Sequence, residues 1–72
     1  MRVLLFGNLA ERFGSSELEI EGEFRISELR AHLATQAGAL PYAVAINGRV
    51  ENEDRVIPSD AEVALLPPFS GG

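Results

Sequence analysis

Hydrophobic positions in the first third of the chain change from a continuous run to a regular alternation. Residues 2–6 form an apolar run that stops at Gly7, which predicts a strand covered on both faces and placed centrally in a sheet. Residues 16–21 alternate, with Leu18 and Ile20 on one side and glutamates on the other. This alternation is typical of an exposed strand with one buried face.

One helix is expected before this second strand and another after it. Asn8 is expected to cap a short helical turn, and Gly14 to end it in the left-handed conformation that glycine adopts easily. The main helix is expected to begin with Ser27 as its N-cap and to close at Gly38. Its narrow apolar stripe, which needs a sheet to pack on, consists of Leu29, Leu33 and Ala37.

The second half of the chain predicts a hairpin and a last strand. Residues 42–47 alternate, and Asn47-Gly48 is the pair favoured in a two-residue type I′ turn, so residues 49–50 should return as a short antiparallel partner. Residues 56–60 are expected to form a turn. Residues 62–66 then form a strand that stops before two prolines, which lack the N–H groups of a strand ladder.

The order of these elements predicts the fold class. Strand, strand, helix, strand, short strand and strand give an α+β domain with a mixed sheet and one main helix packed on one face. The first and last strands are expected to run parallel, side by side in the middle of the sheet, because the intervening helix allows a crossover. This is the plan of the β-grasp (ubiquitin-like) fold, with residues 1–68 as the β-grasp domain and residues 69–72 as a flexible C-terminal Gly-Gly tail.

Composition excludes several classes of function. A net charge of -5 argues against binding to nucleic acid or to anionic membranes, and the absence of cysteine excludes thiolate catalysis and cysteine metal sites. No run approaches the roughly 20 apolar residues of a membrane span, so a cytoplasmic location is expected. His32 has no partner at ligand spacing and is expected to be a solvated helix residue, with no metal site. All six basic residues are arginine.

Chemistry is concentrated in the last six residues, "PPFSGG". The two prolines should direct the tail away from the sheet, and residues 69–72 then have an extended reach of roughly 14 Å. Because Gly71 and Gly72 lack Cβ atoms, they can enter a channel too narrow for other residues. A terminal carboxylate presented in this way can be converted by an ATP-dependent enzyme to an acyl-adenylate, which a sulfur or nitrogen nucleophile can attack.

The stretches "VLLFGNLAERFG" at residues 3–14 and "INGRVENEDRVIPSDAEVALLPPFSGG" at residues 46–72 resemble the family of small subunits of molybdopterin synthase (MoaD). The resemblance implies a sulfur carrier, non-catalytic alone, whose Gly72 is adenylated, thiocarboxylated and donates sulfur to cyclic pyranopterin monophosphate. It implies that Gly71 forms the narrow neck. The implied partners are the large synthase subunit in a heterotetramer, an E1-like adenylating enzyme that uses ATP, and a sulfur donor protein; no cofactor is expected on this chain itself.

A partner-binding surface is expected on the face of the sheet opposite the helix. If Val3 and Leu5 face the helix, alternation places their neighbours on the other face. Contiguous exposed apolar residues often mark interfaces. The expected partner-binding residues are Leu4, Phe6, Ala64 and Leu66 on this face and Pro68, Phe69 and Ser70 in the tail, where the resemblance implies that Phe69 with Pro68 forms the docking segment.

Three alternatives remain open from the sequence. A sulfur carrier for the thiazole of thiamine shares the fold and the Gly-Gly end but typically lacks the Pro-Pro step. A carrier for tRNA thiolation, or a protein modifier whose Gly72 is joined to a partner's lysine, is chemically close. A β-grasp binding module with an inert tail belongs to a different class of function.

Overall fold

The computed structural model describes residues 1–68 of the chain, which form seven strands and two helices. In chain order these elements are β1 (Arg2–Leu5), α1 (Gly7–Phe13), β2 (Glu17–Glu19), β3 (Phe24–Arg25), α2 (Ile26–Ala37), β4 (Ala43–Ile46), β5 (Arg49–Glu51), β6 (Val56–Ile57) and β7 (Glu62–Leu66).

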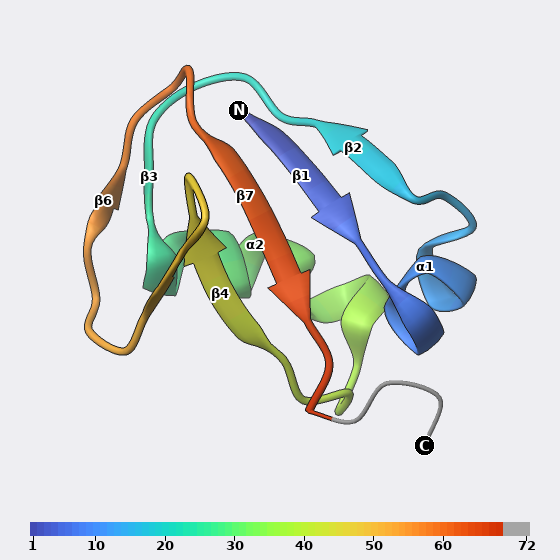
Figure 1. Cartoon of the computed structure of the whole chain (residues 1–72). Helices are drawn as coiled ribbons and strands as arrows, with labels where there is room; N and C mark the ends of the chain where they lie inside the picture. Colours follow the sequence, from blue (N-terminus) through green and yellow to red (C-terminus); the bar gives the residue numbers. More distant parts are fainter. Residues whose placement is uncertain (69–72) are drawn as a thin grey trace.

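Five of the strands form one mixed sheet in the order β2-β1-β7-β4-β5, and β3 pairs with β6 in a separate two-stranded sheet. β7 lies at the centre and runs parallel to β1, as predicted, whereas β4 pairs with β7 in the antiparallel direction. Figure 1 shows β1 and β7 side by side, with α2 behind the sheet. The predicted β-grasp plan, with one main helix on one face of a mixed sheet, is confirmed.

The core lies between the sheet and the two helices. The apolar stripe predicted for α2 is buried, and Ile26 extends it by one turn. Leu9 of α1 joins it. Facing them, alternate residues of the three central strands turn inward, which is what a sheet with one covered face requires. The largest fully buried side chains are Leu9, Leu29, Ile57, Leu65, Val3, Val44 and Val63.

Two turns follow the sequence prediction closely. Gly14 ends α1 with φ 72°, and its N–H donates to the carbonyl oxygens of Ala10 and Glu11. Asn47 and Gly48 have φ values of 50° and 85°, the positive values that a type I′ turn requires at both central positions. The hairpin between β4 and β5 therefore forms as its sequence predicts.

Both predicted N-caps are wrong. Phe6, not Asn8, occupies the N-cap position of α1, and α2 begins at Ile26 with Arg25 before it, so Ser27 lies inside the first turn. The N–H of Ser27 donates to Asp54, a residue far along the chain. Because Asp54 lies in another segment, the residues around Ser27 carry no sequence pattern that would predict this hydrogen bond.

The strand predictions also need three corrections. The run at residues 2–6 is covered on one face only, because Val3 and Leu5 are buried whereas Leu4 is half-buried. Phe6 lies outside β1 and is exposed. Within the predicted turn at residues 56–60, β6 pairs with β3 and buries Ile57, and the turn itself is confined to the residues that follow.

Candidate functional site

The described part of the chain ends beside the start of α1. β7 ends at Leu66, and a Cβ atom added to Gly7 would lie 3.6 Å from Cγ of Pro67. Gly7 has φ 55°, so a residue with a side chain would be strained there. Pro68, the last described residue, is exposed. The other predicted tail residues lie outside the described residues: Phe69, Ser70, Gly71 and Gly72.

The face of the sheet opposite the helices carries the predicted docking residues. Leu4 on β1 lies beside Ala64 on β7 in the parallel register, and both are half-buried. Leu66 follows on β7 with its side chain on the same face. We call this surface the open face. Register and alternation place Leu4, Ala64 and Leu66 on it together, and that these residues and Phe6 bind a partner stays a prediction.

Phe6 reaches the open face from outside β1. Its φ of -127° and ψ of 154° are those of an extended residue, so the alternation of β1 continues through it. Its side chain is 45% exposed. The backbone then turns into α1 at Gly7, close to Pro67. Phe6 therefore stands at the end of the sheet where β7 ends.

The predicted docking residues did not include Ala45 and Val50, which also lie on the open face. Ala45 on β4 lies opposite Ala64 on β7, and Val50 on β5 lies opposite Ala45. The signal was present in the sequence, because the alternation of residues 42–47 and the type I′ turn together fix the face of Val50. The open face consequently spans more of the sheet than β1 and β7.

A charged margin borders the open face along β2. Arg2 donates from Nε to a carboxylate oxygen of Glu17 at 3.1 Å, and its Nη1 lies 3.7 Å from a carboxylate oxygen of Glu62. Glu19 lies opposite Arg2 in the register of β1 and β2. Arg2 is therefore ion-paired with two carboxylates, and a third glutamate lies opposite it in the register, all on the face that carries Leu4.

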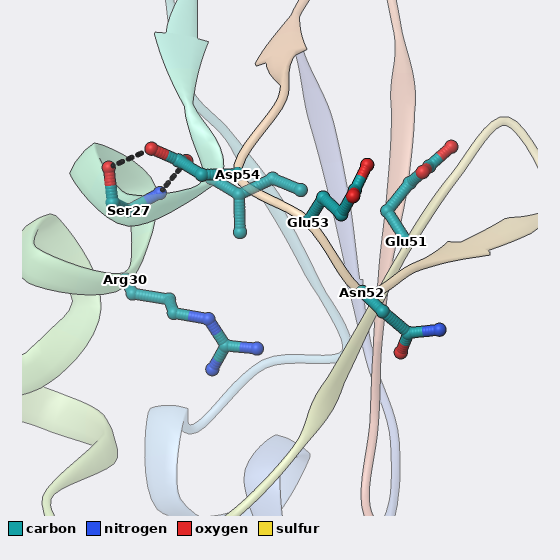
Figure 2. Close-up of a pocket in the computed structure, with 7 residues that line it drawn as sticks. Ser27, Arg30, Glu51, Asn52, Glu53 and Asp54 are labelled. Carbon is teal, nitrogen blue, oxygen red and sulfur yellow. Dashed lines mark hydrogen bonds between the residues drawn. The ribbon is translucent and has the colours of Figure 1, made fainter.

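A shallow hollow of about 150 Å³ lies away from the open face, between the first turn of α2 and the segment after β5. Figure 2 shows Arg30 extending into it from α2, while the carboxylates of Glu51 and Glu53 point away. Both carboxylates are ion-paired to Arg55, at 2.7 Å and 3.7 Å. The guanidinium of Arg30 stacks on the ring of Tyr42, 4.7 Å from its centroid. These groups are satisfied within the chain.

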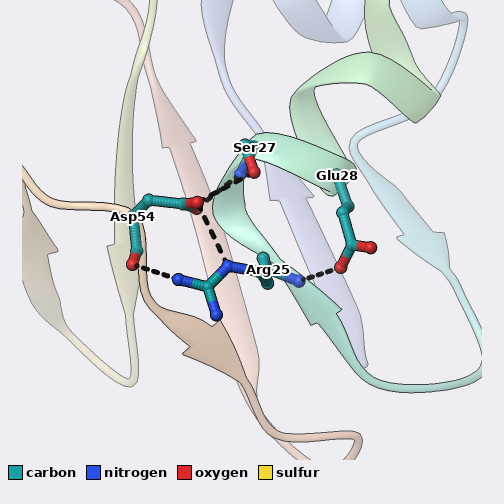
Figure 3. A network of polar contacts seen from close by, with 4 residues as sticks. All are labelled: Arg25, Ser27, Glu28 and Asp54. Atoms are coloured by element: carbon teal, nitrogen blue, oxygen red, sulfur yellow. Dashed lines mark hydrogen bonds and ion pairs between the residues drawn. The ribbon is translucent and has the colours of Figure 1, made fainter.

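Asp54 connects this segment to the N-terminus of α2 (Figure 3). Its carboxylate accepts hydrogen bonds from the N–H and the hydroxyl of Ser27, both at 2.9 Å, and from Nε of Arg25 at 3.2 Å. The hydrogen bonds from Ser27, and then the charge and hydrogen bond of Arg25, lower the pKa of the Asp54 carboxyl below its ordinary value. Glu28 completes the network by accepting from the N–H of Arg25 at 2.7 Å. The network fixes α2 to the loop and has a structural role.

Within residues 1–68, no group of three or more His, Cys, Asp or Glu side chains could hold a metal ion. His32 is exposed on α2, with its ring centroid 5.8 Å from that of Phe24. In this part of the chain no helix is long and apolar enough to span a membrane. What the structure provides is an apolar surface at whose edge the chain leaves the sheet.

Comparison with protein families gives one match that covers almost the whole chain. The family model described as the ThiS family matches residues 3–72. The match includes the open face, α1, β7 and the Gly-Gly ending. No curated protein matches the chain.

Proposed function

The chain belongs to the ThiS family of ubiquitin-like sulfur carriers, and from this premise we propose that it is the sulfur-carrying subunit of molybdopterin synthase. The observation that carries the proposal is the ending of the chain. β7, the central strand, leads directly into Pro67-Pro68 and the residues Phe69 to Gly72. The resemblance of the "D-x-E-V-A-L-L-P-P-x-S-G-G" ending to the molybdopterin synthase subunit supports this pathway over other sulfur-carrier pathways.

The proposed chemistry takes place at the carboxyl carbon of Gly72. Its carboxylate attacks the α-phosphate of ATP in the activating enzyme, which releases pyrophosphate and forms an acyl-adenylate. A sulfide-equivalent nucleophile then attacks the acyl carbon and expels AMP, so a thiocarboxylate replaces the carboxylate. Since the chain has no cysteine, the sulfur comes from outside. The sulfur of the thiocarboxylate finally attacks cyclic pyranopterin monophosphate held by the large subunit, and water then cleaves the acyl C–S bond, which leaves the sulfur on the pterin and returns Gly72 to a carboxylate.

In this proposal the open face docks both enzymes that must reach the tail. The other face is occupied by α1 and α2, whose apolar side chains form the core. The exposed Phe6 and the half-buried Leu66 lie near the point where β7 ends, so a protein bound there stands close to the tail. Pro68, Phe69 and Ser70 guide the tail, and Gly71 forms the neck that passes into each active site.

The mass of the intact chain tests the proposal. After incubation with ATP, the E1-like activating enzyme and a sulfide salt, replacement of one oxygen by sulfur adds about 16 Da. A chain without ATP is the control. No increase in mass in the complete mixture would contradict the proposed carrier chemistry.

The acceptor of the sulfur decides the pathway. The loaded chain is mixed with the large subunit of molybdopterin synthase and cyclic pyranopterin monophosphate, and in parallel with a thiazole-forming enzyme and its substrates. We expect loss of the added mass and formation of the dithiolene only in the first mixture. Transfer only in the second would assign the chain to thiamine biosynthesis, and attachment to a protein lysine would make it a modifier.

A further inference from the structure

Ala45 is only 4% exposed, although it lies on the open face. It is also absent from the core cluster beneath the helices. Its direct neighbours across the sheet are Ala64 on one side and Val50 on the other. Because alanine ends at Cβ, Val50 is the direct neighbour with a side chain large enough to cover Ala45. The apolar surface is therefore continuous from β1 to β5.

Two bulky side chains stand at the borders of this surface. Val50 is 49% exposed on β5, and Phe6 is 45% exposed beyond the end of β1. Between them lie Leu4, Leu66 and Ala64, all half-buried. Large apolar side chains that stay half-exposed around a contiguous apolar surface are typical of a protein interface.

The opposite margin of the sheet is acidic. Glu17 and Glu19 on β2, together with Glu62 on the neighbouring part of β7, outnumber the two cations here, the Arg2 guanidinium and the N-terminal ammonium of Met1, which donates to the carbonyl oxygen of Ile20. The face is thus polarised, with carboxylates at the β2 edge and an apolar side chain at the β5 edge. A partner with basic groups opposite β2 would be attracted in one orientation.

We propose that the docking surface extends across the sheet to Val50 on β5, and that it fits a protein whose apolar surface is bordered by basic side chains facing β2. This rests on the proposed function, in which enzymes that act on the tail dock on the open face. A second copy of the chain fits poorly, since it brings the same acidic margin and a net charge of -5. Val50 determines how far the contact with the partner extends across the sheet, and Glu17 and Glu19 determine the orientation in which the partner binds.

A matched pair of valines tests the extent of the surface. Val50 and Val56 are 49% and 46% exposed, but Val56 lies on β6 outside the five-stranded sheet. The probe is the purified E1-like activating enzyme, and the dissociation constant is measured by calorimetry. We expect Val50→Asp to raise it by at least about tenfold and Val56→Asp to change it by less than about twofold. Equal effects of the two variants would overturn the proposal.

The same pair remains informative if an aspartate disturbs folding. Circular dichroism and thermal unfolding are recorded for every variant. If either aspartate variant unfolds, Val50→Ser and Val56→Ser repeat the comparison, because serine is smaller and uncharged. We expect the same order of effects, and Val50→Ser binding as tightly as wild type would overturn the proposal.

A matched pair of glutamates tests the orientation. Glu19 lies on the acidic margin, whereas Glu23 is exposed between β2 and β3. Replacement by lysine changes the net charge equally in both. We expect Glu19→Lys to slow association by roughly tenfold at low salt and to weaken its salt dependence, with a much smaller effect for Glu23→Lys. If Glu19→Lys and Glu23→Lys had indistinguishable association rates, the proposed basic side chains of the partner facing β2 would be contradicted.

The outcomes separate this inference from the proposed function. If wild type gains no sulfur mass, the proposed function fails whatever the effect of Val50. If wild type is loaded and Phe6→Asp weakens binding while Val50→Asp does not, only the extension to β5 fails. If sedimentation shows a wild-type dimer that Val50→Asp splits, the occupant is a second copy and the proposal is overturned.

Discussion

Phe6 combines an extended backbone with a side chain that is 45% exposed on the open face. An aspartate there would leave the core untouched but place a charge in a desolvated interface. We expect Phe6→Asp to weaken binding to the large subunit of molybdopterin synthase by at least about tenfold. Calorimetry measures the affinity and circular dichroism the fold.

The conservative variant Phe6→Leu is the control for this prediction, because it keeps the apolar character of the position. It should bind within a few-fold of wild type. An unfolded Phe6→Asp variant would show that Phe6 belongs to the fold, and a folded variant with wild-type affinity would show that Phe6 lies outside the interface.

Asp54 makes the stability of the protein depend on pH. Its pKa is lowered in the folded state, mainly by the hydrogen bonds from Ser27 and then by Arg25, so the folded state favours the charged form. This contribution is fully present above the ordinary pKa of aspartate and is lost as the pH falls through the lowered value. The free energy of unfolding of Asp54→Asn should therefore lie below that of wild type at neutral pH, and the difference should shrink in acid.

Urea unfolding over a range of pH measures this difference. Glu53→Gln is the control, because the Glu53 side chain in the same segment is 81% exposed and pairs with Arg55 at 3.7 Å. Glu53→Gln should show a smaller difference from wild type. If the difference in the free energy of unfolding between wild type and Asp54→Asn stayed constant into strong acid, the role of the ionised carboxylate would be contradicted.

At the residue scale, alternation predicted the open face but not the polar contacts. The side chains of Leu4, Ala64 and Leu66 are placed by the two-residue period of their strands, which the sequence displays directly. Ser27 has the composition of an N-cap, yet its N–H is satisfied by Asp54, 27 positions along the chain. Such a partner depends on tertiary contacts that no local pattern records.

The β4–β5 hairpin depends on the backbone of its turn. Gly48 has φ 85°, and a Cβ atom added there would have nothing within 4 Å, so the effect of a side chain would be conformational strain alone. We expect Gly48→Ala to lower the free energy of unfolding by about 1 kcal/mol. Urea unfolding measures it.

Pro58→Ala, at an exposed position outside the large sheet, is the comparison for this hairpin variant. Pro58 does not adopt a left-handed conformation, so its replacement should act mainly on the unfolded chain. We expect Pro58→Ala to change the free energy of unfolding by less than about 1 kcal/mol. If Gly48→Ala were as stable as wild type, the type I′ geometry would not matter for the hairpin.

At the element scale, length decided which strands were predicted. β1 was expected from its apolar run, β2 and β4 from alternation, β5 from the type I′ turn before it and β7 as the strand that stops before the two prolines. β3 and β6 have two residues each, too few to display a period, and Pro58 directly follows β6. They form because Phe24 pairs with Ile57 across the fold, so their pairing is a consequence of the tertiary structure.

At the scale of the whole molecule, the parallel pairing of β1 and β7 followed from connectivity. A helix between the first and last strands permits a crossover, and β7 is accordingly central. This arrangement brings the end of the last strand to the edge of the open face. The tail chemistry was predicted from residue types, and it remains a prediction because Phe69 to Gly72 lie outside the described residues.

The absence of lysine is a property of the whole chain with a chemical consequence. Guanidinium groups stay protonated and do not attack an activated acyl group, whereas a lysine amine can. We expect Arg49→Lys, a charge-neutral change at an exposed position, to increase self-acylated adducts when the chain is adenylated. Mass spectrometry counts them, with Arg49→Gln as the control, and an unchanged adduct yield would remove this explanation.

Docking and chemistry should be separable, because the open face lies in the folded domain whereas the acyl carbon lies at Gly72. A variant lacking Gly71 and Gly72 keeps every described contact, so we expect it to retain measurable binding to the large subunit. It should nevertheless gain no sulfur mass and fail to restore molybdenum cofactor synthesis in a strain without the carrier. Phe6→Asp should show the reverse, with the reactive end present but binding weakened. Restoration by the truncated variant as efficient as that by wild type would place the chemistry elsewhere and contradict the carrier mechanism.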